Sequence, residues 1–140
     1  RLLYGHRSPD GILWPRLRSA VVVNGSLHPV SSRQVAHAVS HSRPGDGWTI
    51  LPTPAPSAVC AALERSRPDA LIIFGGDTAF GILGALGHPS IHPIGELLPG
   101  VPLSRIAPAG RELWLITKAG GFGPPDVLTR IREMIGLIAP

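Results

Sequence analysis

The sequence predicts a single α/β domain, with a mostly parallel sheet and helices on both faces. Short, mostly apolar runs at 19–23, 71–74 and 112–116 are typical of strands, and the valine-rich run at 19–23 is typical of a strand that is buried on both faces. Segments with helix-start signals separate these runs, and the alternation of strand and helix favours right-handed parallel connections. Each of the three runs is followed by a glycine-bearing loop, which places these loops together at the carboxyl edge of the sheet.

Length and composition agree with one folded domain. The 140 residues are 44% hydrophobic and 16% charged, which argues against disorder. No apolar run approaches the roughly 18 residues that cross a bilayer, and the first residues lack the order of a signal peptide. We therefore expect a cytoplasmic protein with no membrane partner. The single cysteine, Cys60, excludes an internal disulfide, and its alanine-rich setting predicts an inert, buried thiol.

The net charge of +4 and the sequence pI of 10.6 fit an anionic partner. The basic residues are scattered rather than gathered into a stripe with aromatic residues, so we expect no nucleic-acid partner. The sequence begins without methionine, and its first residues show no regular period. We expect a piece of a longer protein, with residues 1–18 as a linker or amino-terminal arm and residues 19–140 as the domain.

The first helix follows the strand at 19–23. Ser31 and Gln34 have the spacing of a capping box, which predicts that this helix begins at Ser31 and runs to about Val39. A second strand is predicted at 48–51, after a turn rich in glycine.

Pro54 and Pro56 then predict the start of a second helix, which ends before Pro68. The glycines at 75–76 open a third helix over 79–86 that is apolar all round, and we therefore expect this helix to be buried.

The remaining part of the chain contains one irregular segment. Residues 91–94 are a candidate short strand, whereas the breakers in 95–102 predict a loop that lies across the domain. The strand at 112–116 follows, and apolar residues at helical spacing predict a closing helix over 126–138.

Three loops, at 24–26, 75–78 and 117–123, share one design, because each combines glycine with a polar or basic side chain at the end of a strand. Glycine lets backbone N–H groups approach a ligand closely, and a following helix adds its positive end, so the pattern is typical of a phosphate site. The candidate site residues are Ser26, Gly75, Gly76, Asp77, Thr78, Lys118, Gly120, Gly121 and Gly123.

Other roles for these residues stay open. Asp77 or Thr78 fits the N-cap of the third helix. A carboxylate repels a neighbouring phosphate unless Mg²⁺ lies between them or the side chain turns back onto its own helix. Capping is therefore the first role of Asp77, and a metal-linked role is the second. Lys118 is either a solvated surface lysine or a cation that neutralises phosphate charge. Ser26 is either a loop hydroxyl or a ligand contact. The histidines and the one cysteine lack the spacing of a metal site, and we expect none built from them.

These motifs, taken in chain order, resemble one family. Over about residues 19–137, the chain is similar to the carboxyl-terminal nucleotide-binding domain of the four-carbon acid sugar kinases, formerly a family of unknown function. The blocks that carry the resemblance are Val23-Asn24-Gly25-Ser26, Pro29-Val30-Ser31 with Gln34, Leu71-Ile72-Ile73-Phe74-Gly75-Gly76-Asp77-Thr78-Ala79, Gly95-Glu96, Pro99-Gly100-Val101-Pro102, and Thr117 to Gly123.

The resemblance implies an enzyme that uses ATP and Mg²⁺ to phosphorylate a hydroxyl of a threonate, erythronate or oxo-tetronate type of sugar acid. It places ATP contacts on Ser26, 75–78 and Gly121, and the acid on an amino-terminal domain with an Asp-Asp motif. That substrate-binding domain has no counterpart in this chain, so the chain is expected to be catalytically incomplete alone, and no catalytic residue is assigned. The expected partners are ATP, the sugar acid through the absent domain and, as an open alternative, a second copy of the chain.

Two alternatives follow because the chain departs from the family's pattern. The segment from Gln34 to Leu71 is shorter than the family's usual connection, which fits an interaction module of the same fold that has lost nucleotide binding. A dinucleotide-binding Rossmann-like domain is the other alternative, although neither its Gly-x-Gly-x-x-Gly fingerprint after the first strand nor a P-loop motif is present.

Overall fold

The computed structural model describes residues 3–7, 13–26, 28–41, 45, 47–52 and 54–135. Its centre is a six-stranded sheet of order β4-β3-β5-β8-β7-β6. Four strands are parallel, namely β3 (Ala20–Asn24), β4 (Trp48–Pro52), β5 (Ala70–Phe74) and β8 (Leu113–Lys118). The other two, β6 (His92–Leu98) and β7 (Val101–Ile106), are antiparallel to each other, and β7 is antiparallel to β8. A separate antiparallel pair, β1 (Leu3–Arg7) and β2 (Leu13–Arg16), precedes the sheet.

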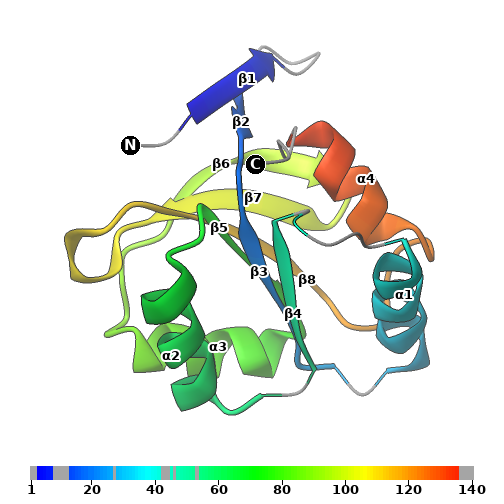
Figure 1. Ribbon diagram of the computed structural model, residues 1–140, viewed down its shortest axis with the longest axis horizontal. Helices are drawn as coiled ribbons and strands as arrows, with labels where there is room; N and C mark the ends of the chain where they lie inside the picture. Colours follow the sequence, from blue (N-terminus) through cyan, green and yellow to red (C-terminus); the bar gives the residue numbers. More distant parts are fainter. Residues whose placement is uncertain are drawn as a thin grey trace.

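Helices cover both faces of the sheet (Figure 1). One face packs against α1 (Pro29–Ser40) and α4 (Val127–Met134), and the other against α2 (Pro56–Ser66) and α3 (Gly76–Ala85). A short 3₁₀ turn, η1 (Pro108–Gly110), connects β7 to β8. The predicted mostly parallel α/β fold is confirmed. Among the described residues, no helix is long and apolar enough to span a bilayer.

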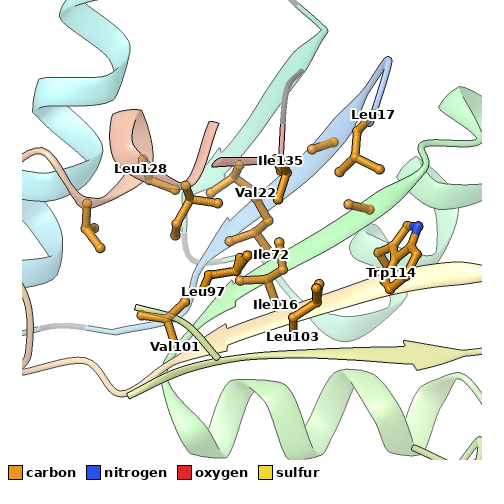
Figure 2. Close-up of a cluster of buried hydrophobic side chains, with 14 of the residues drawn as sticks. Leu17, Val22, Ile72, Leu97, Val101, Leu103, Trp114, Ile116, Leu128 and Ile135 are labelled. Carbon is orange, nitrogen blue, oxygen red and sulfur yellow. The ribbon is translucent and has the colours of Figure 1, made fainter. Parts of the chain in front are cut away.

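Alternation along the strands divides the core into two layers. In β3, Val22 faces the α1 and α4 side, whereas Val21 and Val23 face α2 and α3, as the two-residue period of a strand requires. Figure 2 shows the first layer, in which Leu97 of β6 and Trp114 of β8 belong to one cluster with residues of β3, β5, β7 and α4. Every residue of β3 and of β5 is buried, which explains their almost wholly apolar sequences.

The capping-box prediction for α1 is wrong. The helix begins at Pro29, and its N-cap is His28, whose Nδ1 accepts a hydrogen bond from the N–H of Val30 at 3.1 Å. Proline is favoured in the first helical turn because its fixed φ suits the helix and its missing N–H has no partner there. Starting earlier places Ser31 and Gln34 inside the helix, and both side chains are fully buried.

The expected loop at 95–102 is also wrong, because this segment belongs to the β6–β7 hairpin. The positions of the proline and glycine residues in the hairpin explain why they do not interrupt the strands. Pro93 lies on an edge strand, where a missing N–H costs no ladder bond, and register shifts occur on either side of Gly95 and Glu96. Gly100, at φ 78°, makes the turn between the two strands.

Three further expectations differ from the structure. The third helix, α3, was expected to be buried, but Ile82 is its only buried residue and Phe80 is 74% exposed. The apolar composition of α3 therefore does not make α3 a buried helix. Cys60 is partly exposed rather than buried. The closing helix α4 ends at Met134, and the rest of its predicted range, from residue 136, lies outside the described residues.

Candidate functional site

The three glycine loops meet at one edge of the sheet. They follow β3, β5 and β8, which are adjacent and parallel, so the carboxyl ends of these strands lie side by side. Backbone hydrogen bonds extend the pairing into the loops. The N–H of Gly25 donates to the carbonyl oxygen of Phe74 at 2.9 Å, and the N–H of Gly75 donates to the backbone carbonyl oxygen of Lys118 at 2.9 Å. The predicted meeting of the loops is therefore present, and we call this edge the loop rim.

Two contacts show why glycine is needed at the loop rim. A Cβ on Gly25 would lie 1.9 Å from Oγ1 of Thr78, whose hydroxyl donates to the carbonyl of Gly25 at 3.2 Å. A Cβ on Gly120 would lie 2.2 Å from Oγ of Ser26. Side chains at either glycine would force the loops apart, since Cβ contacts this short do not occur in proteins.

The helix α3 presents an open amino terminus to the rim. Its N-cap is Gly75, at φ 104°, and no side chain caps the helix, so the predicted capping by Asp77 or Thr78 is wrong. The first N–H groups of a helix have no intrahelical partner and carry the positive end of the helix dipole. Gly76 and Asp77 are exposed, and a Cβ on Gly76 would meet nothing within 4 Å. Space is therefore available directly over these amides.

Lys118 lies beneath the loop that follows β8. It is 3% exposed, so it is not the solvated surface lysine that was one alternative. Its ammonium donates to the carbonyl oxygens of Ala119 at 2.6 Å, of Phe122 at 2.7 Å and of Gly120 at 3.5 Å, and it lies 4.6 Å from the centre of the Phe74 ring. Burial lowers the pKa of Lys118 from 10.5 to about 8.

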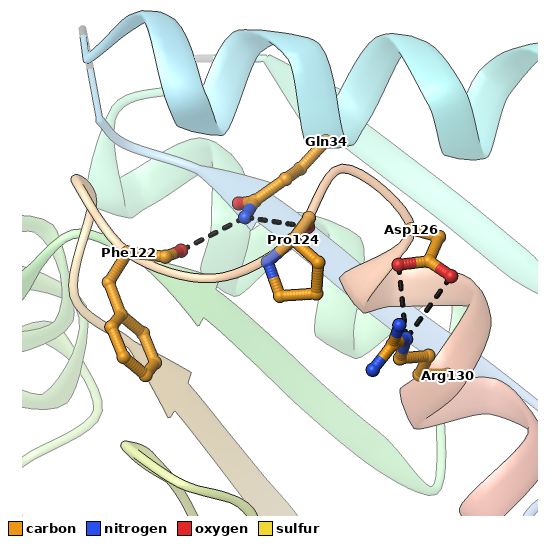
Figure 3. A network of polar contacts seen from close by, with 5 residues as sticks. All are labelled: Gln34, Phe122, Pro124, Asp126 and Arg130. Carbon is orange, nitrogen blue, oxygen red and sulfur yellow. Dashed lines mark hydrogen bonds and ion pairs between the residues drawn. The ribbon is translucent and has the colours of Figure 1, made fainter.

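Two buried side chains of α1 hold the same loop. Ser31 donates its hydroxyl hydrogen to the carbonyl of Gly120 at 2.5 Å. Gln34 donates from Nε2 to the carbonyls of Phe122 at 2.9 Å and Pro124 at 3.0 Å (Figure 3). The Ser31 and Gln34 roles were missed because they were assigned to a helix cap; the proline before them at position 29 is the signal that moves the helix start.

These inner donors determine which way the loop amides face. In a trans peptide, the C=O of one residue and the N–H of the next point in opposite directions, and the described residues contain no cis peptide bond. Because the carbonyls of residues 119, 120 and 122 point inward, the N–H groups of Gly120, Gly121 and Gly123 point outward. None of these three N–H groups donates to another group in the described part of the chain.

Ser26 ends the first loop and lies against the last one, next to Gly120. Its hydroxyl accepts a hydrogen bond from the N–H of His28 at 3.1 Å, and its own N–H donates to Oδ1 of Asn24 at 3.2 Å. The hydroxyl hydrogen of Ser26 remains available to a ligand oxygen. The His28 ring was not predicted to belong here, but it lies against the loop, since a Cβ on Gly121 would be 3.2 Å from it.

The structure thus brings together all nine predicted site residues, in two different ways. Ser26, the first turn of α3 and the outward amides of the last loop form the exposed part. The amides of Gly25 and Gly75 are used within the protein, and Lys118 supports the loop from inside. No group of three His, Cys, Asp or Glu side chains that could hold a metal ion occurs within the described ranges.

Comparison with known proteins identifies the family of the chain. A family described as a nucleotide-binding C-terminal domain matches residues 55–128, slightly more than half of the chain. The D-threonate kinase of Bordetella bronchiseptica is 39% identical over 66 residues, which are 46% of this chain and 16% of that kinase. The D-threonate kinase of Salmonella typhimurium is 36% identical over 77 residues, or 51% of this chain and 18% of that kinase. The matches thus span less than a fifth of each kinase.

Solved structures show the same fold. A domain of unknown function (DUF1537) from Bordetella bronchiseptica, a domain-swapped dimer with bound citrate, has a TM-score of 0.72 at 22% identity, over 86% of this chain and 41% of its own. A Haemophilus influenzae protein of the same family has a TM-score of 0.65 at 16% identity, over 92% of this chain and 43% of its own.

Fold and loop rim together define an α/β domain of the nucleotide-binding class. The chain belongs to the family of nucleotide-binding C-terminal domains found in four-carbon acid sugar kinases, as its sequence predicts. It is therefore a kinase-related domain, similar to part of the D-threonate kinases.

Proposed function

We propose that this domain binds ATP by its phosphates at the loop rim, and that it serves a kinase whose acceptor is a four-carbon sugar acid of the threonate, erythronate or oxo-tetronate type. The observation that carries the proposal is the geometry of the rim. Outward N–H groups of the last loop and the uncapped first turn of α3 follow the adjacent strands β8 and β5, where they provide donors for phosphate oxygens. The D-threonate kinases among the relatives support the class of acceptor.

Each part of the rim has a separate role in the proposal. The amides of Gly120, Gly121 and Gly123 bind phosphate oxygens, and so do the first-turn amides of α3. Ser26 donates its hydroxyl to a phosphate oxygen. Asp77 is exposed beside the first turn, and its carboxylate is available to Mg²⁺ carried by ATP, which keeps most of its ligands as waters and phosphate oxygens. Bound Mg²⁺ supplies neutralisation of phosphate charge during transfer.

The acceptor side is assigned to the kinase outside the matched region. The chain spans less than a fifth of the D-threonate kinases in the matched stretches, and phosphoryl transfer depends on an acceptor that is held in line with the terminal phosphate. Recognition of the sugar acid and activation of its hydroxyl are therefore proposed for the remaining part of such a kinase. A homodimer stays an open proposal, and the related domain-swapped dimer is the observation that favours it.

A matched pair of glycine variants tests the phosphate site. Gly76→Ala places a methyl group in the open space over the α3 amides, whereas Gly81→Ala makes the same change in the same helix against Pro56, at an ordinary contact of 3.6 Å. Both changes favour the helix by up to about 1 kcal/mol. We expect Gly76→Ala to weaken Mg²⁺-ATP binding at least tenfold in calorimetric titration, and Gly81→Ala to leave it unchanged.

Thermal shift separates the alternatives. A ligand at a hundredfold excess over its Kd stabilises the native state by about 2.7 kcal/mol. We expect this gain with Mg²⁺-ATP and none with NAD. A shift with NAD alone favours a dinucleotide-binding domain, and the absence of a shift with any nucleotide favours an interaction module and contradicts the proposal.

A further inference from the structure

Lys118 is the only lysine in the 140-residue sequence, and it has an unusual setting. It is almost completely buried, yet no carboxylate pairs with it among the described residues, where the ion pairs are Arg105–Glu112 and Arg130–Asp126. A buried ammonium without a counter-ion is costly. Its compensation comes from the carbonyl oxygens of the loop, each a partial negative charge that also shapes the loop rim.

The number of donors matches the number of carbonyls. A protonated lysine has three N–H groups, and three loop carbonyls lie within 3.5 Å of Nζ. Loss of one proton leaves a lone pair facing this oxygen cluster and removes the charge that draws the carbonyls inward. The outward direction of the following amides therefore depends on the protonation of Lys118.

Other polar groups near Lys118 do not replace this charge. From α1 the loop receives Ser31 and Gln34, which do not titrate, and β5 contributes the ring of Phe74. Among the described residues, the titratable or charged groups around the loop include His28 against Gly121, Asp77 on the first turn of α3, and Asp126 before α4, which pairs with Arg130. Glu96 of β6 is a fourth, because its carboxylate accepts from the N–H of Gly100, which lies against the Phe122 ring. None of them forms a hydrogen bond or an ion pair with Lys118 within the described part of the chain.

We propose that Lys118 is a positioning residue that couples nucleotide binding to proton uptake: it holds the loop carbonyls inward, and a polyphosphate on the outer side favours its protonated form. The inference rests on the proposed function, since the anion is ATP at the loop rim. It assigns no direct phosphate contact to the lysine. The coupling acts in the range where free Lys118 loses its proton, above about pH 8.

The expected effect is a pH-dependent affinity with a defined sign. Above about pH 8, free protein carries neutral Lys118, and binding takes up a proton, so affinity falls as the pH rises. The fall is at most about tenfold per pH unit, because one proton is involved. It continues until the pH passes the pKa that Lys118 has in the complex. The terminal phosphate, with a pKa near 6 in related esters, is already ionised in this range.

Because there is one lysine, its titration is directly observable. Protein grown with isotope-labelled lysine gives a single side-chain NMR signal, which we would follow from pH 7 to pH 11 with and without saturating Mg²⁺-ATP. We expect the midpoint to rise in the complex. In parallel, calorimetry of wild-type protein at pH 9, in two buffers of different ionisation enthalpy, is expected to show uptake approaching one proton for each ATP bound.

Variants separate a positioning role from simple packing. Lys118→Met is expected to abolish the pH dependence of ATP affinity above pH 8, or to abolish binding while the fold is retained. Arg65→Met removes an exposed charge on α2 and is expected to leave both affinity and proton uptake unchanged. ATP binding without proton uptake and without a shifted lysine midpoint overturns this inference but leaves the proposed function standing. Failure of wild-type protein to bind ATP overturns both.

Discussion

Raising the pH from about 8 to about 10.5 is expected to stabilise the domain through Lys118. Burial lowers the pKa of Lys118 from 10.5 to about 8 in the folded state, whereas the unfolded chain keeps the ordinary value. Between these values the unfolded state binds more protons than the folded state, so the free energy of unfolding increases with pH. Each pH unit contributes about 1.4 kcal/mol, and the whole interval contributes about 3 kcal/mol.

The Lys118→Met variant isolates this contribution. All other titratable groups are the same in both proteins, so the difference between the two unfolding free energies reports Lys118 alone. Near pH 7.5 we expect a small difference, because the variant loses two short charge-assisted hydrogen bonds, about 1.5–3 kcal/mol each, but also loses the buried charge. By pH 10.5 the wild type is expected to have gained about 3 kcal/mol relative to the variant.

Urea unfolding at pH 7.5, 8.5, 9.5 and 10.5, followed by circular dichroism, measures the difference. Similar slopes against urea in the two proteins are needed, since a changed slope indicates a different denatured state. Parallel pH profiles of the wild type and the variant, or a wild type that loses stability relative to the variant, would refute the assignment of a depressed pKa to Lys118.

Two further predictions concern the loop above this lysine. Gln34→Leu removes two hydrogen bonds, but the carbonyls of Phe122 and Pro124 keep other donors. The Oε1 that is also removed has no partner among the described residues. We therefore expect the free energy of unfolding, measured by thermal unfolding, to fall by only about 1–2 kcal/mol. Equal stability of Gln34→Leu and the wild type would show that the two hydrogen bonds of Gln34 contribute nothing to the free energy of unfolding. Gly120→Ala places Cβ 2.2 Å from Oγ of Ser26 and is expected to reduce Mg²⁺-ATP affinity at least tenfold in calorimetry. Removing the clash in a double variant with Ser26→Gly is expected to restore stability toward that of Ser26→Gly alone, and additive losses would contradict the steric explanation.

The parallel strands were predictable because the information is local. β3 and β5 are buried on both faces, so nine of their ten residues are apolar, with Asn24 as the exception. The loops were predictable for a similar reason, since Gly25 and Gly120 are required by contacts at the ends of those strands. The β6–β7 hairpin was not, because whether Pro93 is tolerated depends on its place at the sheet edge, which no local pattern reveals.

Long-range partners explain why the roles of Ser31 and Gln34 were missed. Ser31 and Gln34 have the spacing of a helix cap, but their hydrogen-bond partners lie 88 to 90 residues further along the chain. For Lys118 the sequence left two roles open, a solvated lysine or a cation that neutralises phosphate, and it did not reveal that three carbonyls of its own loop surround the ammonium. The sequence thus predicts which residues gather at the rim, and the structure assigns them to its outer or inner side.

The order of the sheet has a consequence for how such domains diversify. The three loops belong to neighbouring inner strands, whose register fixes their spacing, while β4 and β6 form the two borders. Insertions or deletions at those borders, including the connection between α1 and β4, change the periphery without moving the rim. The flanking segments can therefore differ in length while the register of β3, β5 and β8 keeps the three central loops at a constant spacing.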